Sequence, residues 1–132
     1  MVLSHQDINK IKRTCFQYKR IDYAFLFGSA LKRMRVESDI DILLNGKITP
    51  AQRIDLSLEL EAIVKRKVDI ISAQEVSCEL ALEAFSCGVL LFIRNKENLK
   101  KDYFKKFYLY DDTTNLRKIR VQRIKNKYAR GQ

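Results

Sequence analysis

Residues 26–44 read LFGSALKRMRVESDIDILL, and this stretch predicts the end of one strand, a turn and a second strand. The apolar run 21–27 stops at Gly28-Ser29, which is typical of a buried strand that ends in a turn. Nine residues after Ser29, acidic and apolar side chains alternate and then give way to apolar ones, which predicts a second strand over 38–44. Two strands that meet at a glycine and a pair of carboxylates indicate a polar site at one end of a sheet.

Capping signals and hydrophobic periodicity predict the elements around this stretch. The expected elements are helices at 4–19, from Thr49-Pro50 to about 65, from Ser72 with Glu75 to Gly88, at 95–109 and at 113–129, strands at 67–71 and 89–93, and a turn at Asn45-Gly46. This order of helices and strands predicts one domain of the α/β (α+β) class, with helices packed on a small sheet.

Length and composition exclude several classes of protein. The 132 residues suit one domain, and 46% hydrophobic with 32% charged residues excludes a disordered or fibrous chain. The longest apolar run, 89–93, is too short to cross a bilayer, and residues 1–10 contain no apolar signal-peptide core. Three cysteines without a CxxC favour neither a disulfide framework nor a zinc knuckle. We therefore expect a cytoplasmic protein with no membrane association.

The basic charge is concentrated at the end of the chain. Residues 1–99 carry 15 Lys/Arg against 13 Asp/Glu, a net charge of +2, whereas residues 100–132 carry 11 against 3, a net charge of +8. A basic segment of this kind suits a nucleic acid, an acidic partner surface or a solvated helix. We expect residues 1–99 to form the main domain. Residues 100–132 would be a basic helical extension that belongs to the same domain or docks a partner.

Three carboxylates are candidates for a metal site. Asp39 and Asp41 alternate along one strand and so project from the same face. Such hard oxygen ligands suit Mg²⁺ or Mn²⁺, which neutralise the repulsion between adjacent carboxylates. Asp69, in the strand 67–71, could lie beside them if the two strands pair. Three carboxylates can hold two metals for an in-line phosphoryl transfer, and Asp69 could also accept the proton of the attacking hydroxyl.

The segment between the strands supplies candidates for phosphate binding. Gly28 lets the backbone approach a phosphate, and the Ser29 hydroxyl can donate to it. Lys32 and Arg33, together with Arg35, could neutralise the remaining charge. Taken singly, these residues suit a plain turn and a solvated loop equally well. Their combination with the three carboxylates favours phosphoryl transfer.

The same residues resemble a known family. LFGSALKRMRVESDIDILL, with the later aspartate in KVDIIS, resembles the minimal nucleotidyltransferase (MNT) domains of the DNA polymerase β superfamily over about residues 20–93. The resemblance implies a small mixed sheet flanked by helices. It further implies that Gly28 and Ser29 hold the nucleotide phosphates, that Asp39 and Asp41 ligate both metals, and that Asp69 is the third ligand and the base.

One feature of the sequence departs from the family pattern. Many members have ten residues between Gly-Ser and the first aspartate, with an Ala-Arg-Gly run among them. This chain has nine, and Arg33 stands where the glycine is expected. The departure leaves the three carboxylates in place and concerns the loop around the phosphates.

The resemblance also implies a setting. Small single-domain members are antitoxins that pair with a HEPN-domain ribonuclease toxin, and some transfer AMP from ATP to a tyrosine of that toxin. Two alternatives remain open at this stage. One is an antitoxin that neutralises its toxin by binding alone through the basic C-terminal helices, and the other is an enzyme that adds nucleotides to an RNA end held by the basic tail.

Aromatic residues are interleaved with lysines over 99–110. They could stack on bases while the lysines hold phosphates, but we favour a helix whose Phe104, Phe107 and Tyr108 dock on the sheet. The segment 113–129 predicts a basic helix that docks an acidic partner, stays solvated or contacts RNA. The single histidine, His5, is expected to be exposed on the first helix, and the three cysteines are expected to pack in the core.

Overall fold

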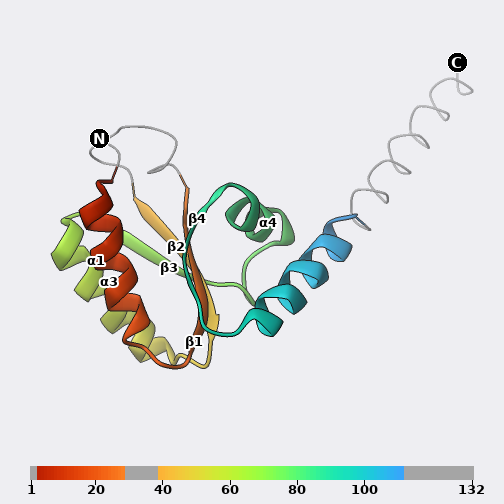
Figure 1. The fold of residues 1–132 in the computed structure, drawn as a ribbon, viewed down its shortest axis with the longest axis horizontal. Helices are drawn as coiled ribbons and strands as arrows, with labels where there is room; N and C mark the ends of the chain where they lie inside the picture. Colours follow the sequence, from red (N-terminus) through yellow and green to blue (C-terminus); the bar gives the residue numbers. More distant parts are fainter. Residues whose placement is uncertain (1–2, 29–38, 112–132) are drawn as a thin grey trace, which may run out of the picture.

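A computed structural model describes residues 3–28 and 39–111 (Figure 1). The elements in chain order are α1 (His5–Phe16), β1 (Ile21–Phe27), β2 (Ile40–Gly46), α3 (Pro50–Val64), β3 (Val68–Ser72), α4 (Cys78–Cys87) and β4 (Val89–Ile93), followed by a helix over 96–111. The fold is of the predicted α+β class. The predicted helix at 113–129 lies outside the described residues.

The four described strands form one mixed sheet in the order β3-β2-β1-β4. β1 pairs antiparallel with β2 and β4, whereas β2 and β3 run parallel. Helices α1 and α3 cover one face, and α4 with helix 96–111 lies over the other (Figure 1). The prediction of a small mixed sheet flanked by helices is confirmed.

Strict alternation along β2 divides the core in two. Ile40, Ile42 and Leu44 are fully buried on the face of α1 and α3, where they meet Leu56 and Leu60 of α3. On the opposite face, the core comprises Tyr23, Phe25, Phe27, Leu43, Ala73 and Ala84. Because side chains alternate, Asp41 shares this second face with Leu43.

The helix starts follow the capping chemistry of the sequence, with one correction. Thr49 and Gln52 form the predicted capping box at the start of α3, and Ser4 caps α1 by accepting from the Asp7 N–H. The predicted start at Ser72 is wrong, because the carbonyl of Ser72 closes a turn and α4 begins after Ser77. The spacing of Ser72 and Glu75 satisfies the capping pattern without continuing into a helix.

Strand β2 is longer than predicted at its C-terminal end. We expected Asn45-Gly46 to form a turn, but Gly46 pairs with Ile21 and ends the strand. A Cβ at Gly46 would lie 2.1 Å from the Arg20 carbonyl oxygen, so the close approach of the two backbones requires glycine.

Polar contacts attach helix 96–111 to the sheet. Tyr23, whose side chain is fully buried, donates its hydroxyl to Asp102 Oδ2 at 2.7 Å, and the Asn45 amide donates to the same oxygen. Lys106 Nζ donates to the Val76 carbonyl at 2.9 Å. Asp102 is the shared acceptor and fixes the side of the helix that faces the sheet.

The opposite side of helix 96–111 is exposed. Phe104, Phe107 and Tyr108 expose 54%, 46% and 64% of their surface. The prediction that these three side chains dock on the sheet is therefore wrong, because the polar contacts of Asp102 and Lys106 set the rotation of the helix.

Two smaller predictions concern the cysteines and the histidine. Cys15 is buried as expected, but Cys87 is exposed at the end of α4 and does not pack in the core. His5 is exposed on α1, as predicted. Within 3–28 and 39–111, no helix has the length and apolar content that crossing a bilayer requires.

Replacing Asp102 tests the polar attachment of the helix. Asp102→Ala removes the acceptor of two partly buried donors, so we expect it to lower the free energy of unfolding by about 1–3 kcal/mol. Urea denaturation measures the loss. The matched control is Asp111→Ala, an exposed carboxylate on the same helix, and equal losses for the two variants would contradict the assignment.

Candidate active site

The site is built at the end of β1 and the start of β2. Phe27, the last residue of β1, pairs with Asp41, and Gly28 follows directly. Gly28 has a φ of +96°, and a Cβ there would lie 2.2 Å from Asp41 Oδ2. Glycine is therefore required on both counts, because it permits the left-handed backbone and leaves room for the carboxylate.

Parallel pairing of β2 and β3 brings the second carboxylate alongside. Asp41 is the register partner of Asp69, so both side chains leave the same face of the sheet at neighbouring strands. Burial, and after it the negative charges of Asp69 and Asp39, raises the pKa of Asp41 from 3.8 to about 6. The face that carries Asp41 thus collects negative charge in a partly desolvated place.

Of the remaining predicted site residues, the structure describes Asp39 but not those of the segment 29–38. Asp39 is described, is half-buried and acts electrostatically on Asp41. Ser29, Lys32, Arg33 and Arg35 lie outside the described residues. In the part of the chain that is described, no three His, Cys, Asp or Glu side chains are grouped so that they could hold a metal ion. The three-carboxylate metal site therefore stays a prediction.

The chemistry of the donors nevertheless fits a divalent cation. The candidate ligands are carboxylate oxygens, which Mg²⁺ and Mn²⁺ prefer. The raised pKa of Asp41 shows that its charge is poorly compensated by the described protein groups, and a cation would compensate it. The arrangement can therefore bind a cation together with an anionic substrate.

A groove that the sequence did not reveal lies beside this site. It has a volume of about 210 Å³ between α3 and the edge strand β3, and it is lined by Arg53, Ile54, Ser57, Leu58, Val68, Asp69 and Ile70. Ile54 and Leu58 expose 61% and 59% of their surface there. In the sequence, Ile54 and Leu58 count only as apolar positions that continue the helix from Thr49-Pro50 to about residue 65. One feature of the sequence could have indicated their exposure. Ile54 and Leu58 are offset by two residues from Leu56 and Leu60, so α3 has two apolar stripes and only one of them can face the core.

A substitution at Gly28 tests the close contact. Gly28→Ala places a methyl group against the Asp41 carboxylate at a left-handed φ, so we expect a loss of about 1–3 kcal/mol in the free energy of unfolding. The loss should shrink when Asp41 is also replaced by Ala, because the steric part disappears. Urea denaturation of the single and double variants measures it, and strict additivity would contradict the contact.

The charge on Asp41 has a second consequence, for stability against pH. Its pKa is raised in the folded state, so the ionised form destabilises the fold and stability falls as pH rises from about 4 through about 6. We expect Asp41→Asn to be more stable than the parent at pH 8, by about 1–2 kcal/mol after allowance for solvent screening. Urea denaturation in the presence of a chelator at pH 8 and at pH 4 measures the difference. A difference that persists unchanged at pH 4 would contradict the electrostatic cause.

Comparison with known proteins adds independent findings. The profile of the family described as polymerase beta, nucleotidyltransferase matches residues 9–97. A comparison with curated proteins finds no match. Among solved structures, the toxin-antitoxin MntA-HepT is similar with a TM-score of 0.69 at 18% identity, over 92% of this chain and 98% of that one.

Two further structures are similar to the same extent. One is the tri-AMPylated Shewanella oneidensis HEPN toxin in complex with MNT antitoxin, with a TM-score of 0.69 at 19% identity. The other is a toxin-antitoxin with AMP-PNP, with a TM-score of 0.68 at 20% identity. Each match covers 92% of this chain and 98% of the other. At these identities the structures establish a shared fold.

The family profile spans every described strand, the glycine at the end of β1, and Asp39, Asp41 and Asp69. It covers well over half of the chain, and the fold agrees with it. The chain belongs to the polymerase beta nucleotidyltransferase family.

Proposed function

We propose that this protein is an MNT-type antitoxin that transfers AMP from ATP to a tyrosine hydroxyl of a HEPN-domain ribonuclease toxin. The observation that carries the proposal is the register of Asp41 with Asp69, beside a glycine that lies against the Asp41 carboxylate, in a chain of the nucleotidyltransferase family. The similar structures support the acceptor, since one of them holds an AMPylated HEPN toxin with an MNT antitoxin. Another holds AMP-PNP, an analogue that supports ATP as the donor.

The proposed reaction is a single in-line displacement. The acceptor oxygen forms a bond to the α-phosphorus of ATP, the bond from that phosphorus to the β-phosphate oxygen breaks, and pyrophosphate leaves. Asp69 accepts the proton of the attacking hydroxyl, a role that the resemblance to the family implies and that its position beside Asp41 supports. Gly28 leaves the end of β1 open to the phosphates. Ser29, Lys32 and Arg33 are assigned to nucleotide binding from the sequence.

The carboxylates would hold the metal that this family uses. We assign Asp39, Asp41 and Asp69 as ligands of Mg²⁺, or of Mn²⁺ in its place. When bound, the cation supplies charge neutralisation for the triphosphate and for the leaving pyrophosphate. The clustering of negative charge around Asp41 supports this assignment.

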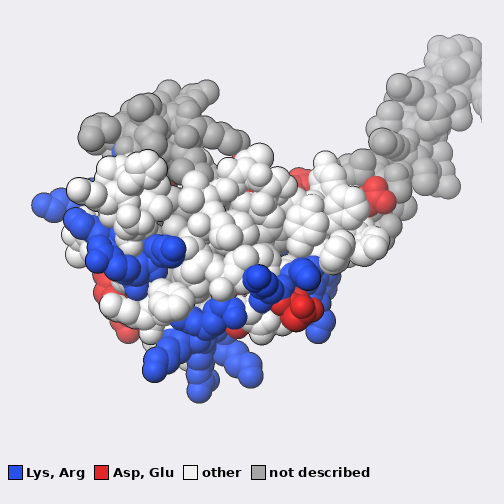
Figure 2. All heavy atoms as spheres, in the orientation of Figure 1, with Lys and Arg blue, Asp and Glu red and all other residues white. Residues whose placement is uncertain are grey.

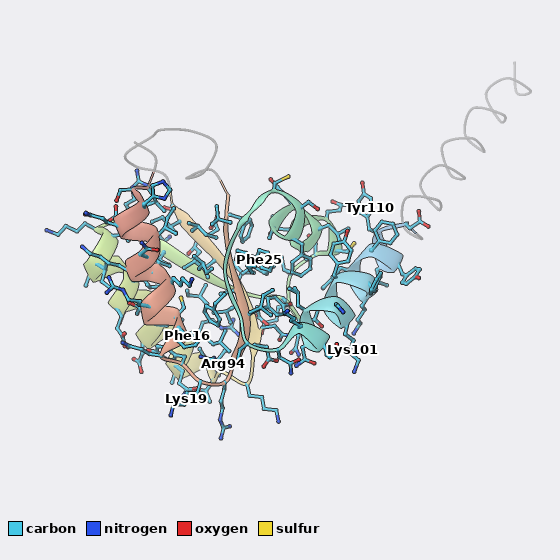
Figure 3. The ribbon with its side chains drawn as sticks, viewed as in Figure 1. Phe16, Lys19, Phe25, Arg94, Lys101 and Tyr110 are labelled. Atoms are coloured by element: carbon cyan, nitrogen blue, oxygen red, sulfur yellow. The ribbon has the colours of Figure 1, made fainter. Side chains whose placement is uncertain are left out.

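Helix 96–111 is the surface that we assign to toxin docking. Its aromatic residues are exposed, and Lys100, Lys101 and Lys105 flank them in the sequence. Figure 2 shows charged side chains gathered below this helix and uncharged surface above it. An apolar cavity of about 290 Å³ opens at its base, lined by Phe25, Phe85, Leu99, Lys100, Tyr103 and Phe104. Phe25 is visible there, between the sheet and the helix (Figure 3). Exposed aromatic groups around an apolar cavity are typical anchors of a protein interface.

We further propose that the antitoxin and its toxin act in the cytoplasm.

A second candidate function rests on the same helix. Aromatic side chains among lysines also suit single-stranded RNA, so an enzyme that adds nucleotides to RNA ends is the alternative. An antitoxin that acts by binding alone is the non-enzymatic alternative, and it requires no function of the carboxylates.

The experiment is transfer of label from α-³²P-ATP in the presence of Mg²⁺ and host-cell lysate. We expect a labelled protein band with the α-labelled nucleotide and no band with γ-labelled ATP, because the γ-phosphate leaves in pyrophosphate. Asp41→Asn should lower the labelling by at least a hundredfold.

The controls separate the alternatives. Label on RNA would favour the RNA-end enzyme, and such binding should weaken steeply with salt. Absence of any label, with toxin still neutralised by both parent and Asp41→Asn proteins, would overturn the enzymatic proposal in favour of binding alone.

A further inference from the structure

The groove between α3 and β3 is the part of the surface that the catalytic residues do not explain. Ile54 and Leu58 are one helical turn apart and are more than half exposed, although the same helix buries Leu56 and Leu60 on its other side. Large apolar side chains that stay exposed along a groove mark a binding surface. Asp69 also lines this groove, but its carboxylate leaves the opposite face of β3 from α3. An extended occupant paired with the strand edge would alternate in the same way, so one of its side chains would enter the groove and the next would face the proposed base.

The outer edge of β3 limits how an occupant can bind. β3 is the last strand of the described sheet, and helix α3 covers the beginning of its edge. The Ser57 hydroxyl donates to the Val68 carbonyl at 2.8 Å, and the Val68 N–H donates to Glu61 Oε1 at 3.1 Å. Backbone groups of a strand alternate between its two sides, so those of Ile70 point the same way as those of Val68. Among the described residues, the position of β3 whose edge groups are left for pairing is thus Ile70, next to Asp69.

Polar groups lie at the end of the groove where β3 ends. The carbonyl of Ser72 is taken by the turn that follows β3, where it accepts from the N–H groups of Glu75 and Val76. The Arg53 guanidinium pairs with Glu75 through its two terminal nitrogens. Its Nε is buried and has no hydrogen-bond partner among the described residues. An occupant that offers a carbonyl oxygen would satisfy that donor.

We propose that this groove binds the acceptor protein itself, as an extended segment next to the residue that receives AMP. The segment pairs with the edge of β3 at Ile70, places an apolar side chain on Ile54 and Leu58, and offers a backbone carbonyl to Arg53 Nε. An extended backbone supplies both kinds of contact at once, which is the usual chemistry of strand addition to a sheet edge. This inference rests on the proposed function.

The proposal has a consequence for specificity. Asp69 and Ile70 are consecutive, so the hydroxyl that reaches Asp69 and the residue that pairs with Ile70 are close neighbours in the acceptor. The modified tyrosine should therefore have an apolar residue within about three positions. A small acceptor such as N-acetyltyrosine amide reaches Asp69 without using the groove.

The test compares the double variant Ile54→Ser/Leu58→Ser with the parent. Both positions are exposed, so the fold should be retained, which circular dichroism and urea denaturation check. The acceptor is the purified protein that carries the label in the α-³²P-ATP assay. We expect the KM for this protein to rise at least tenfold, while the KM for ATP and the rate with N-acetyltyrosine amide stay within twofold. Leu90→Ser, at an apolar position on β4 that exposes 46% of its surface, is the control and should leave all three values unchanged.

The outcomes separate this inference from the proposed function. If the parent labels the acceptor and the double variant does so with an unchanged KM, the groove does not bind the acceptor, although the transfer activity stands. An equal loss with N-acetyltyrosine amide would also overturn the inference, because the substitutions would then disturb the site itself. If the parent labels no protein, the proposed function fails and this inference fails with it.

Discussion

The electrostatic repulsion between Asp41 and Asp69, which lie side by side on neighbouring parallel strands, is the cost that the rest of the sheet must offset. Two carboxylates at this spacing repel each other, and burial of Asp41 adds to the cost. The arrangement is maintained because the alternate positions of β2 are fully buried, with Ile40 and Ile42 packed against α1 and α3. A slip of one residue would turn these side chains to the other face and the Asp41 carboxylate into the core under α1 and α3, so apolar burial on one face fixes the carboxylates on the other.

The contacts that attach helix 96–111 and the residues of the candidate active site lie at opposite ends of β1. Gly28 and Asp41 lie where β1 ends, whereas Arg94 and helix 96–111 are tied to its beginning. Arg94 donates to the carbonyls of Tyr18 and Ile21, and its guanidinium carbon lies 4.5 Å from the centre of the Phe16 ring. Figure 3 shows Arg94 and Phe16 next to each other. Polar contacts are therefore concentrated at the start of β1, whereas the poorly compensated charge of Asp41 lies at its end.

The sequence predicted those helices and strands whose positions follow from a local pattern of residues. Strand β1 and the capping box of α3 match their predicted positions, because alternation and capping are local. The predicted start of α4 is wrong, because Ser72 with Glu75 has the capping-box pattern but forms a turn, while Ser77 caps the helix without a Glu or Gln three residues later. The exposure of Phe104 and Phe107 could not be predicted, because it follows from the distant contact of Tyr23 with Asp102. The same reason applies to Ile54, whose exposure depends on where β3 ends the sheet.

The edge of β3 links these points. A free strand edge is a hazard for a soluble domain, and proteins usually cover or charge it. Here α3 covers the edge at Val68 with Ser57 and Glu61, and the turn after β3 closes it at Ser72. The short interval between them lies beside Asp69. Among the described residues, the edge of β3 is thus covered on both sides of Ile70 and left unpaired next to a carboxylate. If an acceptor segment pairs there, as we propose, this geometry would select the acceptor more than the carboxylates shared by the family.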